Sequence, residues 1–108
     1  MMKEIISTNV IVRNKFTMKK MLEIFQASKQ YNGSTFLYSN HKAVDATNLT
    51  KLVSFLLTCK TKSTLKIIVE GENVQEHLDL ISNVCTGHVT ILKISQKRFL
   101  NTSETFQL

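Results

Sequence analysis

The chain has 108 residues, enough for one domain to bury a hydrophobic core without a disulfide or a metal ion. Apolar residues make up 43% of it and charged residues 20%, as in globular proteins, and the net charge is +6. The N-terminus has no apolar signal-peptide core and no run of about 18 apolar residues occurs, so we expect a cytoplasmic protein without a membrane span.

The first predicted elements are a strand and an amphipathic helix. Residues 5–12, "IISTNVIV", are β-branched and partly alternating, which predicts a strand. A helix follows with Thr17 as its N-cap, and it should end near Gln30, because "YNGS" supplies a glycine. Its expected buried face has the spacing i, i+3, i+4, i+7 and consists of Met18, Met21, Leu22 and Phe25.

A hairpin and a second helix come next. The strands 35–39 and 42–46 are separated only by Asn40 and His41, which predicts a tight turn. Asn48 is a good N-cap for the helix that follows. The apolar stripe of this helix is the clearest in the chain and consists of Leu49, Leu52, Val53, Leu56 and Leu57.

The last elements of the domain are a central strand and a third helix. Residues 65–70, "LKIIVE", are almost continuously apolar, as in the middle strand of a sheet. Asn73 and Glu76 have nearly the spacing of a capping box, and Gly87 should end the helix. Its apolar positions are Val74, Leu78, Ile81 and Cys85.

The order βαββαβα predicts an α+β fold, with an antiparallel sheet and three helices on one face. We assign this open-faced two-layer sandwich to residues 1–86. Residues 87–108 form a C-terminal extension with one more strand, over 88–94, and a polar tail. An added apolar strand can cover a sheet edge, so we expect it to cover one within the chain or across a homodimer.

The charges are unevenly distributed along the sequence. Basic residues gather before and within the first helix (Arg13, Lys15, Lys19, Lys20), and acidic residues surround the start of the third (Glu70, Glu72, Glu76, Asp79). This polarity favours docking to a protein. Nucleic-acid binding is not expected, because the chain has no tryptophan, no aromatic pair of the RNA-binding type and no basic arm.

Cofactor, metal and catalytic signatures are not found in the sequence. Cys59 and Cys85 are far apart, so we expect two reduced, buried thiols and no zinc site. There is no catalytic triad and no glycine-rich phosphate loop, so we expect no cofactor and no enzymatic activity. His41, His77 and His88 are interpreted as ordinary exposed or partly packed histidines.

From residue 3 to residue 85 the chain resembles HPr, the histidine-containing phosphocarrier of the sugar phosphotransferase system. The segments "QASKQY", "NHKAVDATNL" and "IIVEGENVQEHLDLI" are similar to the end of the first HPr helix, its hairpin with the start of the second helix, and its last strand and third helix. The resemblance implies the HPr fold.

The HPr motif G-[LI]-H-A-R-P-A, laid on the chain without gaps, falls on "KFTMKKM". Thr17 takes the place of the phosphohistidine, and Lys19 and Lys20 take those of the arginine and proline. In the family the histidine carries a phosphoryl group at a helix N-terminus, where backbone N–H groups favour anions. A hydroxyl cannot replace the imidazole in this relay, but the anion-friendly helix start remains.

The resemblance also suggests further site residues. The family's regulatory serine falls on Asn48, which cannot accept phosphate. Its partner patch falls on Leu49, Lys51 and Leu52. An anion or partner site at the first helix would use Thr17 together with the basic residues Arg13, Lys15, Lys19 and Lys20.

Two functions remain open from the sequence. In the first, an HPr-like protein has lost phosphoryl transfer and binds a component or regulator of the phosphotransferase system, or a permease. In the second, it is a working carrier or phospho-acceptor that uses Thr17 or a non-standard histidine. The two lysines in the first helical turn oppose the helix dipole, so they either lie exposed or pair with an anion.

Overall fold

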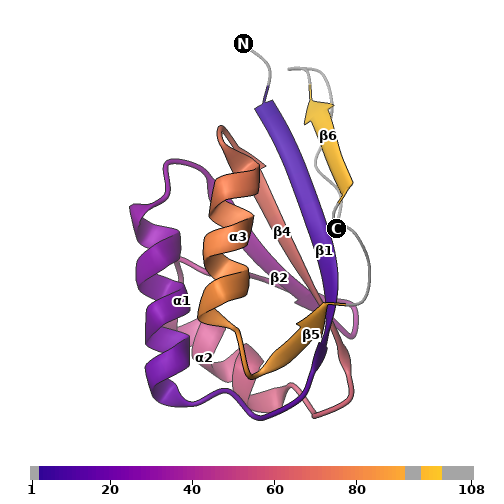
Figure 1. The fold of residues 1–108 in the computed structure, drawn as a ribbon. Helices are drawn as coiled ribbons and strands as arrows, with labels where there is room; N and C mark the ends of the chain where they lie inside the picture. The colour runs from indigo at the N-terminus through magenta and orange to yellow at the C-terminus, as the bar shows by residue number, and fades with distance from the viewer. Residues whose placement is uncertain (1–2, 92–95, 101–108) are drawn as a thin grey trace.

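The computed structural model describes residues 3–91 and 96–100 (Figure 1). Its elements, in chain order, are β1 (Lys3–Val12), α1 (Met18–Gln30), β2 (Ser34–Ser39), β3 (Lys42–Asp45), α2 (Leu49–Thr58), β4 (Thr64–Gly71), α3 (Val74–Val84), β5 (Val89–Ile91) and β6 (Gln96–Leu100). The predicted order of the first seven elements is confirmed.

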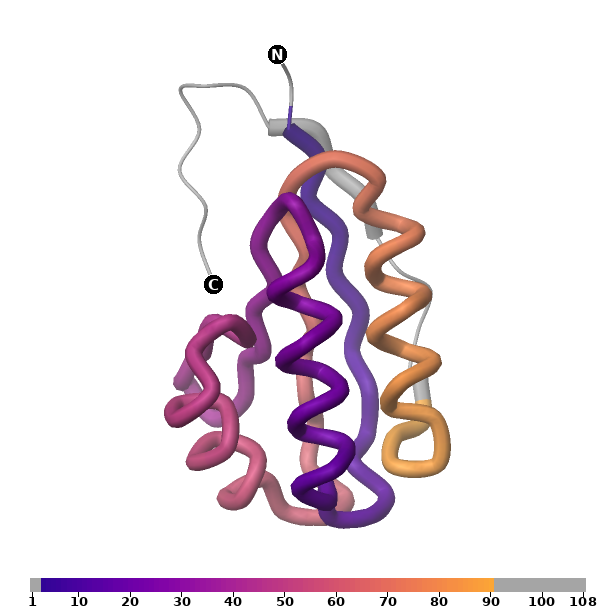
Figure 2. Tube along the Cα trace, turned by 90° about the vertical axis from the view of Figure 1, so that its left-hand side faces the viewer, coloured from indigo at the N-terminus to yellow at the C-terminus, as the bar shows by residue number. Residues whose placement is uncertain are grey.

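The strands form one antiparallel sheet in the order β3-β2-β4-β1-β5, with β6 also paired to β1. The three helices cover one face and leave the other open (Figures 1 and 2), so the predicted open-faced α+β sandwich is confirmed. β4 lies in the middle, as its apolar run predicted. Its Ile68 is buried even on the open face, where it is paired with Phe36.

The C-terminal extension continues the sheet along β1. β5 pairs with residues 10–12 of β1, and β6 pairs with residues 3–7. The predicted strand over 88–94 is therefore present at 89–91, and 92–94 lie outside the described residues. β6 was not predicted, because "QKRFL" is too short for a clear alternation and was interpreted as part of a polar tail. The edge that the extension covers belongs to the same chain.

The buried face of α1 differs from the predicted one. Its core residues are Met21, Ile24, Ala27 and Ser28, whereas Met18 and Leu22 are 54% and 38% exposed. The real face is turned by roughly 90° about the helix axis. The prediction missed it because small residues extend the buried stripe, and the Ser28 hydroxyl becomes acceptable there by donating to the Ile24 carbonyl.

The helix caps and the hairpin turn show why the elements begin where they do. Asn48 caps α2 by accepting the Lys51 N–H, as predicted. The predicted capping box of α3 is wrong, because Asn73 adopts a left-handed conformation and its side chain makes no capping bond. Asn40 and His41 both have positive φ, as a type I′ hairpin turn requires.

Candidate functional site

The candidate site is the segment that leads from β1 into α1. The backbone of Val12 is bonded to the turn before β4, through Ser63 O and Lys62 N. Phe16 is 5% exposed and anchors the segment in the core. The next residue, Thr17, is extended, and its Oγ1 accepts the Lys20 N–H at 3.2 Å. Thr17 is therefore the N-cap of α1, as predicted.

The start of α1 favours an anion on geometric grounds. The first N–H groups of a helix have no partner within the helix, and together with the helix dipole they attract negative charge. Thr17 satisfies the N–H of Lys20. The N–H groups of Met18 and Lys19 belong to the same first turn and are directed out of the helix end.

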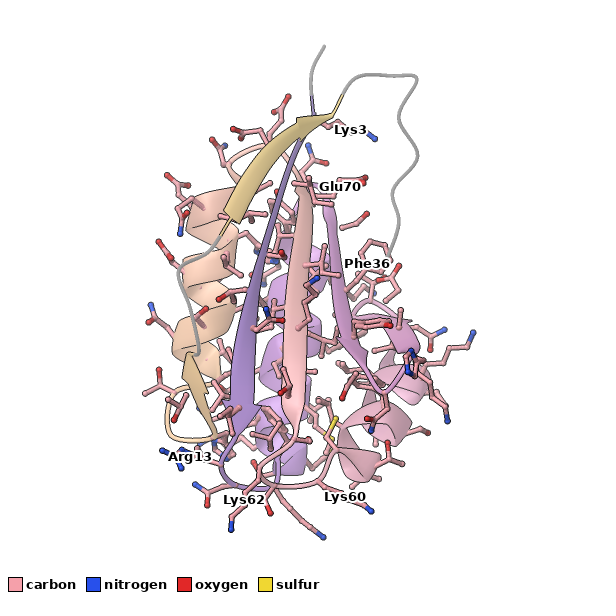
Figure 3. The ribbon with its side chains drawn as sticks, turned by 90° about the vertical axis from the view of Figure 1, so that its right-hand side faces the viewer. Lys3, Arg13, Phe36, Lys60, Lys62 and Glu70 are labelled. Atoms are coloured by element: carbon pink, nitrogen blue, oxygen red, sulfur yellow. The ribbon has the colours of Figure 1, made fainter. Side chains whose placement is uncertain are left out.

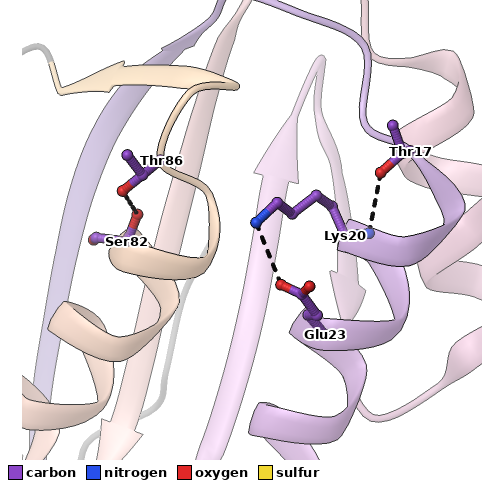
Figure 4. A network of polar contacts seen from close by, with 5 residues as sticks. All are labelled: Thr17, Lys20, Glu23, Ser82 and Thr86. Atoms are coloured by element: carbon purple, nitrogen blue, oxygen red, sulfur yellow. Dashed lines mark hydrogen bonds and ion pairs between the residues drawn. The ribbon is translucent and has the colours of Figure 1, made fainter.

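Lys20, which the sequence also placed in this site, is already engaged within the helix. Its ammonium pairs with Glu23 at 3.3 Å, and its side chain extends toward the end of α3 (Figure 4). Burial raises the pKa of the Cys85 thiol there to about 12, and the Lys20 ammonium opposes that shift. One of the two lysines that oppose the α1 dipole is thus neutralised, and the other, Lys19, is exposed.

Five exposed cations gather at one end of the molecule. Arg13, Lys15 and Lys19 are exposed. The turn between α2 and β4 adds Lys60 and Lys62, which lie at the same end of the molecule as Arg13 (Figure 3). Among the described residues, Lys3 pairs with Glu70 and Lys20 with Glu23, and none of these five cations forms an ion pair. We call Arg13, Lys15, Lys19, Lys60 and Lys62 the basic end.

Sequence reasoning missed Lys60 and Lys62, although a signal was present. The segment "CKTKS" is basic and directly precedes the central strand. Lys62 lies beside the candidate site because its N–H donates to the carbonyl of Val12, the last residue of β1. Because β4 pairs with β1 in antiparallel orientation, the segment that precedes β4 and the segment that follows β1 lie at the same end of the sheet.

His88, interpreted from the sequence as an ordinary exposed or partly packed histidine, packs beside the segment that leads into α1. Its ring stacks on Phe16, with the centroids 5.6 Å apart and the planes 18° apart. Its carbonyl accepts the N–H groups of Arg13 and Asn14, and the Asn14 side-chain amide donates to Gly87 O at 2.7 Å. Its Nδ1 is buried and has no hydrogen-bond partner within the described structure.

The register of β5 explains this placement. Val12 pairs with Val89 in antiparallel orientation, so the residue before Val89 lies beside the residue after Val12. Arg13 is fixed further by its Nε, which donates to Thr90 Oγ1 at 2.8 Å. The extension therefore contacts residues 13–16, the segment that precedes Thr17, which no spacing in the sequence could indicate.

The expected regulatory position, Asn48, and the three positions of the expected partner patch differ in exposure. Asn48 and Lys51 are exposed at the start of α2 and Leu49 is half-buried, but Leu52 is completely buried and is unavailable to a partner. Larger exposed apolar side chains lie elsewhere on the two neighbouring helices, at Met18 and Leu22 of α1 and Leu57 of α2.

Other kinds of site find little support in the described residues. The part of the chain that the structure describes holds no group of three or more histidine, cysteine, aspartate or glutamate side chains placed to bind a metal ion. Cys59 and Cys85 are both buried and unpaired, as predicted. None of the described helices combines the length and the apolar character needed to cross a membrane.

No protein-family model and no curated protein matches the sequence. Among solved structures, the histidine-containing phosphocarrier protein of a mycoplasma matches with a TM-score of 0.66 over 73% of this chain and 90% of its own, at 11% identity. HPr from Bacillus anthracis str. Ames matches with a TM-score of 0.63 over 74% and 95%, at 21% identity. The chain has the HPr fold.

A third structure, HPr-C-His from Thermoanaerobacter tengcongensis, matches with a TM-score of 0.63 over 72% and 88% of the two chains, at 15% identity. The identities are low, so these likenesses establish the fold. They agree with the fold that the resemblance in the sequence implies. Thr17, onto which that resemblance lays the HPr phosphohistidine, is the N-cap of the first helix in the structure.

Proposed function

We propose that this chain is an HPr-like protein that binds an acidic partner and does not relay phosphate through residue 17. One observation carries the proposal: the Thr17 hydroxyl stands at the helix start and serves as its cap. A hydroxyl needs a separate base to become a nucleophile, and its phosphate ester is far less labile than a phosphoramidate. Residue 17 therefore does not transfer a phosphoryl group, whereas the cationic helix start is retained.

The partner surface that we propose combines charge with apolar contact. Lys15 and Lys19 are exposed and close in the chain to the exposed side chains of Met18 and Leu22. An acidic patch with an apolar centre would complement a surface that combines them. The partner is a component or regulator of the phosphotransferase system, or a permease, in the cytoplasm. The chain acts by binding rather than by catalysis, and as a monomer, because the edge of β1 is covered within the chain.

Incubation with Enzyme I and phosphoenolpyruvate, followed by intact-mass measurement, tests the loss of relay. The wild type should gain no phosphoryl group, and Thr17→His tests whether an imidazole at this position restores the gain. A stoichiometric phosphoryl group on the wild type overturns the first proposal. For binding, Lys15→Glu with Lys19→Glu should abolish capture of acidic phosphotransferase components, and Lys29→Glu, at the other end of α1, is the matched control.

A second function is favoured by the position of His88. Its imidazole stacks on the residue before Thr17 and lies beside the loop that carries Arg13 and Lys15. In this alternative, an imidazole nitrogen of His88 attacks the phosphorus of a phosphohistidine donor. A new N–P bond forms as the donor's N–P bond breaks, and the cations of the basic end neutralise the transferred group.

The same mass measurement separates the two functions. Under the second, the wild type gains an acid-labile phosphoryl group and His88→Asn does not. His41→Asn, which changes an exposed histidine in the hairpin turn, keeps the gain. A phosphoryl group that persists in His88→Asn contradicts the assignment of His88.

A further inference from the structure

A cavity lies at the opposite end of α1 from the candidate site. It is formed between the last turn of α1 and the first turn of α3, and its volume is about 570 Å³. Pockets that bind small ligands or side chains have volumes of about 300–1,000 Å³. We propose that this cavity, the α1–α3 pocket, binds the guanidinium or ammonium group of a basic side chain presented by a segment of a partner protein.

The aromatic wall of the α1–α3 pocket is held in place from several sides. Tyr31 and His77 stack face to face, with their ring centroids 3.9 Å apart and their planes 6° apart. The Tyr31 hydroxyl donates to the carbonyl of Glu72 at 2.5 Å, and the His77 Nε2 lies 2.8 Å from Thr35 Oγ1. A side chain on Gly33 would collide with the Tyr31 ring, so backbone packs against that ring. The wall is therefore preformed.

The charge at the rim selects a cation. Glu72 and Glu76 line the pocket and are exposed, whereas no lysine or arginine is among its lining residues. Burial lowers the pKa of His77, so its ring is neutral near pH 7 and adds no opposing charge. The dipole at the start of α3 contributes only about half a positive charge, which two carboxylates outweigh.

The remaining lining residues suit a side chain more than a free amine. Leu80 is 48% exposed at the rim, and with Ala27 it offers apolar surface to the aliphatic stem of a lysine or arginine. The side chain of Asn73 makes no capping bond, so its amide is free to bond to a partner backbone.

The test uses the full chain, labelled with ¹⁵N, and the peptide N-acetyl-Leu-Arg-Leu amide at low salt. Saturable amide shifts are expected at residues 30–32 and 72–77. The same peptide with citrulline in place of arginine is uncharged and should bind at least about tenfold more weakly, since charge-assisted hydrogen bonds are lost. Glu72→Gln with Glu76→Gln should weaken arginine-peptide binding by a similar factor.

Asp79→Asn is the matched control, because Asp79 lies on the same helix outside the pocket and bonds to Gln75. It should leave binding within about twofold of wild type, since distant surface charges are screened. Circular dichroism melts of the three proteins establish that each is folded.

Each other outcome overturns a stated part of the proposal. Equal binding of the arginine and citrulline peptides would show that the pocket does not recognise a cation. A loss of binding in Asp79→Asn as large as in the double variant would show that the effect comes from the net charge of the protein and not from the pocket. If agmatine binds as tightly as the peptide, the ligand is a free amine and not a side chain of a protein. If added unlabelled protein produces the same amide shifts, the partner is a second copy of this chain. None of these outcomes bears on phosphoryl transfer or on the basic end, so this proposal and the proposed function fail separately.

Discussion

Replacement of His77 by alanine should lower the free energy of unfolding by about 1.5–4.5 kcal/mol. His77 is 4% exposed, and its Nε2 is 2.8 Å from the hydroxyl of Thr35, which is completely buried. Leaving that hydroxyl without a partner costs about 1–3 kcal/mol. Loss of the stacked contact with Tyr31 costs about 0.5–1.5 kcal/mol more. Urea unfolding near pH 8 measures the sum.

His77 should also give the stability a pH dependence of definite sign. Burial lowers its pKa in the folded chain below the ordinary value of 6.5, so around that pH the unfolded chain binds a proton that the folded chain does not. The contribution of His77 is complete above 6.5 and is lost as the pH falls from there toward the folded pKa. The slope in this window is at most about 1.4 kcal/mol per pH unit.

Unfolding curves of the wild type and His77→Ala between about pH 7.5 and 5 test this reasoning. The wild type should lose more stability on acidification than the variant. His41→Asn removes an exposed histidine and keeps a residue that tolerates positive φ, so it should retain the wild-type slope. Parallel curves for the wild type and His77→Ala would refute the assignment of the titration to His77.

Three further predictions concern the fold and the start of α1. Gly33→Ala should destabilise by about 1–3 kcal/mol, because its Cβ would meet backbone, and a urea midpoint equal to wild type contradicts the packing. Thr17→Ala should lower the free energy of unfolding by about 1 kcal/mol, whereas Thr17→Asp should leave it unchanged, since aspartate also caps helices. Equal losses of stability in the two variants, measured by thermal melts, would exclude a capping role for Thr17. Truncation after Thr86 should lower the melting temperature by more than about 5 °C, because it removes β5 and β6 and uncovers the edge of β1. An unchanged melting temperature together with an unchanged solution mass would contradict a stabilising role of the extension.

The fold followed from the sequence wherever local patterns and packing agree. The apolar run of β4 predicted a central strand, and Asn48 predicted the start of α2. α1 departed from its pattern because apolar periodicity alone cannot show that Ala27 and Ser28, rather than Met18 and Leu22, face the sheet. That choice depends on how the whole helix packs.

The candidate site followed from the sequence only in its local part. The capping role of Thr17 depends on neighbours within four residues, and it was predicted. The contribution of His88 depends on a strand pairing between the two ends of the chain, which leaves no local signature. The direction of the Lys20 side chain combines both cases, since its partner Glu23 is three residues away and the end of α3, near which it lies, is distant in the sequence.

The pairing of β6 with β1 joins residue 3 to residue 100, and this has a consequence for biosynthesis. A ribosome makes β1 long before β6, so the edge of β1 that β6 covers stays open while the residues between the two strands are being made. Contacts so distant in sequence close slowly, because the loop entropy must be lost before any of them forms. Nascent chains that stall before residue 96 are therefore the species most exposed to strand-to-strand aggregation.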